Sequence, residues 1–205
     1  MSETRGNPTG PGGHGLRVGF VAGVTPDKWA RSWRERPGRI RLHLVPQEES
    51  EAESAVRSGD VDMALVRLPV DRDSLHLVRL YDEVTVVVVA RDHPVAAYDE
   101  IALADLADEQ FIGGPPGDLT PGVEQLGFPG MSAQEAVEAV AAGTGIVVLP
   151  MSVARLHHRK DVVHRPVVGL PPTTIALIWR VDRDDELTQA FVGVVRGRTP
   201  RSSRG

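Results

Sequence analysis

The sequence predicts an α/β fold from three observations. Residues 61–68 and 84–90 are short, nearly continuous apolar runs, which are typical of strands buried on both faces. Segments with helical spacing of apolar residues alternate with such runs along the chain. The 205 residues, 41% of them hydrophobic and 25% charged, are enough for two lobes that each bury a core. Alternation of strands with helices is the pattern of α/β proteins.

The first expected strand covers residues 16–22, which are apolar and β-branched. Residues 1–15 precede it and are rich in Gly and Pro, so they are predicted to be a disordered tail. A Gly and Pro break at residues 23–26 ends the strand, and residues 27–36 have helical composition. The chain is therefore expected to begin with a strand, a tight loop and a helix.

The next elements continue the alternation. Residues 40–46 alternate apolar and polar side chains as a strand does, and residues 48–58 predict a helix that Gly59 ends. Two buried strands follow, at residues 61–68 and 84–90.

The remaining elements begin with a helix that Ser132 caps and Glu135 supports, as in a capping box. Glycines end this helix near residue 143. The later segments are predicted to be a strand at 145–150, a helix at 151–157, a strand at 173–179 and an amphipathic helix at 184–196.

Composition excludes several classes of function. Cys is absent, so disulfides, thiolate zinc sites and cysteine nucleophiles are excluded. The formal net charge of -5 gives no electrostatic reason to bind nucleic acid. The polar start has no apolar core of a secretory signal, and residues 84–90, the longest apolar run, are too short to cross a bilayer. A cytoplasmic protein without a membrane segment is expected.

Motifs for cofactor binding or catalysis are also missing. His157, His158 and His164 lack a carboxylate pattern that would complete a metal site, so they are interpreted as surface-loop residues. The glycine clusters match neither a phosphate-binding loop nor a dinucleotide fingerprint, and no Gly-x-Ser-x-Gly elbow is present. We therefore expect no cofactor, no metal and no enzymatic activity.

Two polar residues follow predicted strands at positions where open α/β sheets bind ligands. Thr25 lies directly before a helix whose free amides and positive dipole end suit an anion, although it also fits a simple helix cap. Arg67 lies at the end of the strand at 61–68, where it fits either a clamp on a carboxylate or an ordinary surface ion pair.

Five segments in order resemble the effector-binding domain of LysR-type transcriptional regulators. They are LRVGFVAGVTP, GDVDMALVRLP, LYDEVTVVVVARDHPVA, IALADLADEQFI and AVEAVAAGTGIVVLP, within residues 16–199. The resemblance implies a type II periplasmic-binding-protein fold, with two Rossmann-like lobes joined by crossover strands. It places residues 16–86 and 163–198 in lobe I, residues 87–162 in lobe II, and a basic tail at 199–205.

The resemblance also implies that a small effector binds between the lobes. The loop after the first strand, the end of the third strand, two glycines and the start of the lobe II helix would line that cleft. Carried over, the ligand-binding residues are Val24, Thr25, Pro26, Arg67, Leu68, Gly113, Gly114, Met131 and Ser132.

The chain departs from the family pattern in two places. Only a Gly/Pro tail precedes the first strand, where the family's regulators carry a winged helix-turn-helix, so direct DNA binding is not expected. Residues 111–131 are compressed and rich in Gly and Pro where relatives place a strand and a helix.

Two other classes of protein share this fold and stay alternatives. They are the solute-binding protein of a transporter and an enzyme such as a prephenate dehydratase.

Family members pair side by side, so the resemblance implies a homodimer or a heterodimer with a full-length relative. The pairing elements would be residues 40–46 and 48–58. Within the second segment, Ala52, Ala55 and Val56 fit either a small apolar seam for a partner or the lobe's own core.

Overall fold

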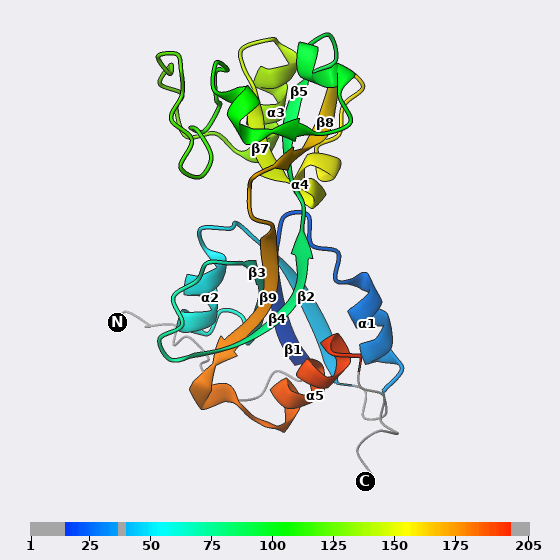
Figure 1. Ribbon diagram of the computed structural model, residues 1–205. Helices are drawn as coiled ribbons and strands as arrows, with labels where there is room; N and C mark the ends of the chain where they lie inside the picture. Colours follow the sequence, from blue (N-terminus) through cyan, green and yellow to red (C-terminus); the bar gives the residue numbers. More distant parts are fainter. Residues whose placement is uncertain (1–14, 37–39, 198–205) are drawn as a thin grey trace, which may run out of the picture.

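A computed structural model of the chain describes residues 15–36 and 40–197. It has two lobes, each built around a mixed sheet, which meet at a narrow connection (Figure 1). This is the predicted α/β fold with two lobes. Apart from Gly15, which begins the first strand, the predicted tails at 1–15 and 199–205 lie outside the described residues.

The first lobe contains a sheet of five strands in the order β2-β1-β3-β9-β4. The strands are β1 (Gly15–Val21), β2 (Arg41–Gln47), β3 (Met63–Arg67), β4 (Leu75–Glu83) and β9 (Thr173–Arg180). The first three pair in parallel, whereas β9 is antiparallel to both β3 and β4. Because β1 and β3 are parallel neighbours, the segments that follow them leave the sheet at the same edge, which faces the second lobe (Figure 1).

Helices cover both faces of this sheet. They are α1 (Asp27–Arg34), α2 (Ala52–Ser58) and α5 (Glu186–Val195), with a 3-10 turn at Val181–Arg183. Figure 1 shows α2 on one side of the sheet and α1 with α5 on the other. The ring of Trp33 on α1 meets that of Phe191 on α5 edge to face, with centroids 5.6 Å apart, and this pair closes one face of the core.

The second lobe has a smaller sheet in the order β6-β8-β5-β7. Its elements are β5 (Thr85–Ala90), β6 (Ile101–Ala102), β7 (Val147–Pro150), β8 (Val162–Val168), α3 (Ala133–Ala141), α4 (Met151–Leu156) and 3-10 turns at Pro94–Ala97 and Leu103–Leu106. Strand β5 is buried on both faces, as its continuous apolar run predicts. Val86 and Val88 belong to one core cluster, and Val87 and Val89 belong to the other.

The chain crosses between the sheets twice. Only Val84 separates β4 from β5, and residues 169–172 separate β8 from β9. The hydroxyl of Thr85 donates to the carbonyl of Pro171 at 3.1 Å, so the two crossings are joined side by side. Lobe II was expected to end at residue 162. Residues 162–168 instead pair with β5 and β6 of the second lobe, so the chain crosses back to the first lobe only after them.

The compressed segment at 111–131 is held without a regular strand or helix of its own. Phe111 forms an isolated bridge with Ile146. The Gln125 side chain accepts from the Phe111 amide at 2.9 Å, and the Gln110 side chain accepts from the Leu126 amide at 3.0 Å. Side-chain amides thus take the place of a strand's backbone ladder here.

Helix α2 corrects one expectation. Ala52, Ala55 and Val56 are all buried in the core of the first lobe, so the interpretation as an apolar seam for a partner is wrong. The helix also begins at Ala52, because residues 48–51 form a turn before it. None of the helices within residues 15–36 and 40–197 has the length and hydropathy that a membrane span requires.

Candidate ligand-binding cleft

The two lobes touch where the loop after β1 meets α4. Gly23 has a φ of +83°, a conformation that favours glycine, and a Cβ built on it would overlap the Ser152 hydroxyl and lie 3.0 Å from the Ser152 carbonyl carbon. Any larger residue at position 23 would therefore push α4 away. This close approach brings the end of a first-lobe strand against the start of a second-lobe helix.

Thr25 does not cap the helix that follows it, so the interpretation of this residue as a helix cap is wrong. Pro26 is the N-cap of α1, and no side chain accepts from the first amides. Thr25 is exposed beside the contact between the lobes, whereas Val24 and Pro26 are buried against the first lobe. The Thr25 side chain is therefore open to solvent at the contact between the lobes.

Arg67 is buried behind the contact between the lobes and lines neither cavity, and its guanidinium makes four hydrogen bonds to protein atoms. Its side chain is 3% exposed. It donates to Glu83 at 3.0 Å and to Glu49 at 3.3 Å, and through Nη2 to the Ala22 carbonyl at 2.8 Å and the Ser152 hydroxyl at 3.0 Å. It therefore joins the loop after β1, the end of β4 and α4 of the second lobe.

Neighbouring carboxylates compensate the positive charge of Arg67. Glu83 is also buried, with 6% of its side chain exposed, so the Arg67–Glu83 pair is a buried ion pair rather than a surface one. Burial raises the pKa of the neighbouring Tyr81 hydroxyl, Glu83 adds to the rise, and the Arg67 charge opposes it. Glu49 brings a second carboxylate, so the positive charge of Arg67 is already met within the protein.

Two cavities flank the contact between Gly23 and Ser152. The larger has a volume of about 820 Å³ and the smaller about 410 Å³. Both are lined by Gly23, Thr25 and Ser152, and thus by residues of both lobes. The larger is also lined by Phe20, Ala22, Val24, Pro46, Gln47, Glu48, Glu51, Arg155 and Leu156. Its size is typical of small-molecule sites.

The other expected ligand residues lie outside these cavities. Gly113 and Gly114 have positive φ values and open space around them, in the compressed segment of the second lobe. Met131 is exposed, and Ser132 takes part in the capping box of α3. Leu68 precedes a cis peptide bond to Pro69 and donates its amide to the Thr174 carbonyl at 2.9 Å. The structure therefore brings only Val24 and Thr25 of the nine to the cavity walls.

Sequence reasoning missed the second-lobe side of the cavities, which Ser152 and Arg155 of α4 form. The sequence does contain a feature that could have predicted this wall. Helix α4 directly follows the carboxyl end of β7, and open sheets bind ligands at such strand ends. Among residues 15–36 and 40–197, no group of three His, Asp or Glu side chains is placed to hold a metal ion.

Comparison with known proteins identifies the class to which this fold and cleft belong. The profile of the LysR substrate binding domain matches residues 14–200. The chain therefore belongs to the LysR substrate-binding domain family, as the five segments predicted. The domains of this family are regulatory, so the protein is not an enzyme; it is an effector-binding domain of the LysR type.

Similar curated proteins are transcriptional regulators. The Hca operon transcriptional activator HcaR of Escherichia coli is 26% identical over 201 residues, covering 89% of this chain and 67% of HcaR. The regulator CatR of Pseudomonas putida is 32% identical over 162 residues, covering 72% of this chain and 55% of CatR.

Solved structures share the fold. The effector-binding domain of BenM with its effector benzoate has a TM-score of 0.70 at 21% identity, covering 90% of this chain and 94% of that domain. The reduced OxyR regulatory domain from Pseudomonas aeruginosa has a TM-score of 0.64 at 21% identity, covering 89% of this chain and 95% of that domain. The two-lobed type II periplasmic-binding-protein fold is thus the observed one.

Proposed function

We propose that the chain senses a small carboxylate in the cleft between its lobes and passes the signal to transcription as part of a LysR-type regulator in the cytoplasm. The observation that carries this proposal is the cavity of about 820 Å³, whose walls come from both lobes. A ligand that touches both walls binds the closed arrangement better than the open one, and so shifts the population toward it.

Arg155 is the better candidate for the carboxylate anchor. Four hydrogen bonds and two carboxylates already occupy Arg67, whereas Arg155 on α4 lines the cavity and takes part in no ion pair between described residues. Thr25 supplies a hydroxyl from the opposite lobe. The related BenM domain holds benzoate, which supports a carboxylate as the class of ligand.

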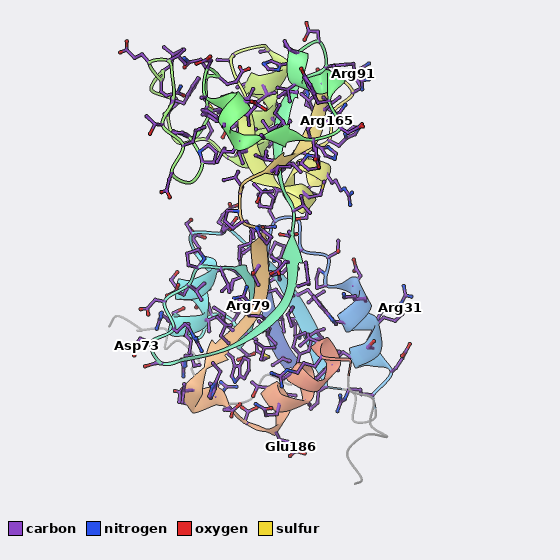
Figure 2. The ribbon with its side chains drawn as sticks, in the orientation of Figure 1. Arg31, Asp73, Arg79, Arg91, Arg165 and Glu186 are labelled. Atoms are coloured by element: carbon purple, nitrogen blue, oxygen red, sulfur yellow. The ribbon has the colours of Figure 1, made fainter. Side chains whose placement is uncertain are left out.

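Calorimetry against a panel of carboxylates, including benzoate, and of their neutral amides tests the proposal. The carboxylates should bind and the amides should not. We expect Thr25→Ala to weaken binding by about 1 kcal/mol and Arg155→Gln by roughly twice that, because a charge-assisted hydrogen bond is worth more than a neutral one. Arg31→Gln is the matched control, since Arg31 projects from α1 away from the cleft (Figure 2).

Equal loss of affinity in Arg155→Gln and Arg31→Gln would contradict the proposed anchor. Carboxylate binding that neither Thr25→Ala nor Arg155→Gln weakens would place the ligand elsewhere, for example near Gly113, Gly114, Met131 and Ser132 in the second lobe.

A further inference from the structure

The larger cavity carries opposite charges on its two walls. On the first-lobe wall, Glu48 and Glu51 lie in the turn before α2. On the second-lobe wall, Arg155 lies in the last turn of α4. No ion pair between described residues includes any of these three side chains, although all three are exposed at the cavity. The two acidic groups and the basic group are therefore available to a ligand.

The acidic wall is held in place by the fold. The amides of Glu51 and Ala52 both donate to the Glu48 carbonyl at 3.0 Å, which closes the turn. Ala52 is buried in the first-lobe core, and Glu49, between the two cavity acids, pairs with Arg67. Glu49 thus compensates the buried arginine while its two neighbours line the cavity.

Arg67, which bonds the cavity residues Ala22 and Ser152 from behind the wall, offers no free positive charge to a ligand. Arg67 is already paired with Glu83 at 3.0 Å and with Glu49 at 3.3 Å. A ligand with a carboxylate alone would meet Arg155 on one side and two uncompensated carboxylates on the other. Like charges in one site repel, and a ligand that also carries a cation would convert this repulsion into attraction.

We infer that the effector is an amino acid or a similar amino carboxylate, whose ammonium group faces Glu48 and Glu51 and whose carboxylate faces Arg155. The inference rests on the proposed function and narrows its ligand class. The remaining walls fit the rest of such a molecule, because Phe20 and Leu156 offer apolar surface on opposite lobes. The ammonium and the carboxylate would pull the two walls together as the cleft closes.

Binding of matched ligand sets tests the inference. The purified chain is titrated by calorimetry with the standard L-amino acids, and each one that binds is compared with its deaminated acid and its decarboxylated amine. We expect the amino acid to bind about tenfold more tightly than either partial ligand, which corresponds to about 1.4 kcal/mol. The same carboxylate panel as above is run in parallel.

Variants test which wall of the larger cavity causes the preference for an amino acid over each partial ligand. The double variant Glu48→Gln/Glu51→Gln should lose the preference for the amino acid over its deaminated acid, whereas Arg155→Gln should lose the preference over the amine. Glu138→Gln is the matched control, because Glu138 is an exposed glutamate on α3 that lines neither cavity.

The outcomes separate the two proposals. Carboxylates that bind as well as amino acids, or an unchanged preference in Glu48→Gln/Glu51→Gln, overturn the inference and leave the carboxylate sensor standing. If neither amino acids nor carboxylates bind at millimolar concentration, the proposed function falls and the inference falls with it.

Discussion

At the scale of single residues, the buried pair of Arg67 and Glu83 makes a prediction about stability. Arg67→Ala should lower the free energy of unfolding by about 3 kcal/mol, because it leaves the Glu83 carboxylate buried without its partner. Urea denaturation followed by circular dichroism measures this change. The double variant Arg67→Ala/Glu83→Gln removes the stranded charge, so it should be more stable than Arg67→Ala; a double variant less stable than Arg67→Ala would contradict this account.

His164 on β8 makes a prediction about pH. Burial lowers its pKa, and repulsion from Arg155, Arg165 and His158 lowers it further. The unfolded chain therefore takes up this proton at a higher pH than the folded chain does. The stability that neutral His164 contributes is present above about pH 6.5, the ordinary histidine value, and is lost as the pH falls from there toward the folded pKa.

The measurement is the melting temperature between pH 7.5 and pH 5.5. We expect it to fall less in His164→Asn than in the unmodified protein. His43→Asn, in the other lobe, is the matched control. An equal fall in His164→Asn and the unmodified protein would show that His164 does not carry the effect.

The roles of single residues were harder to predict than their places in the chain. Arg67 was predicted to lie at the end of a strand, and that position is confirmed. Its partners Glu49 and Glu83 come from a turn and from another strand, 18 and 16 residues away. Long-range pairing of this kind depends on how the strands are ordered in the sheet, which local spacing does not encode.

At the scale of elements, α3 offers a test of its predicted start. The Ser132 hydroxyl accepts from the Glu135 amide at 3.3 Å, and the Glu135 carboxylate accepts from the Ser132 amide at 2.8 Å, so the predicted capping box is confirmed. The Ser132 amide and the Ser132 hydroxyl both donate to the Glu135 carboxylate at 2.8 Å, and these two bonds lower the pKa of Glu135. Ser132→Ala should destabilise the protein by about 1 kcal/mol.

Thermal unfolding measures this loss. Ser132→Asp is the matched control and should stay close to the unmodified protein, because aspartate is also a strong N-cap residue. If Ser132→Asp loses as much as Ser132→Ala, the serine has a role other than capping.

Elements with a clear local pattern were predicted well, and the others were missed. The apolar run of β5 and the spacing of α3 each matched one kind of element. Strand β8 was missed because His164, Arg165 and Pro166 interrupt its apolar residues. The smaller helix α4 was predicted, but its part in the cleft was not, because that part depends on how the two lobes meet.

At the scale of the whole molecule, we predict a homodimer. Strand β2 lies at the edge of the first sheet, with one side unpaired by any described strand, and Ile40 beside it is 45% exposed. Because Ala52, Ala55 and Val56 are buried in the core of the first lobe, the prediction rests on β2 and on the family resemblance. Light scattering at high micromolar concentration should give the dimer mass, and Ile40→Glu should shift it toward the monomer. A monomer throughout that range would rule the homodimer out.

The two crossings between the sheets determine how the lobes can move. One tether is a single residue, Val84, whose carbonyl also accepts from the Met151 amide at 2.9 Å, and the other includes two prolines in residues 169–172. Tethers this short and stiff prevent the lobes from sliding, but a few backbone torsions still let them tilt. A molecule bound near this hinge would therefore change the angle between the two lobes. The lobes serve as lever arms, so the largest displacements occur at their outer ends, farthest from the ligand.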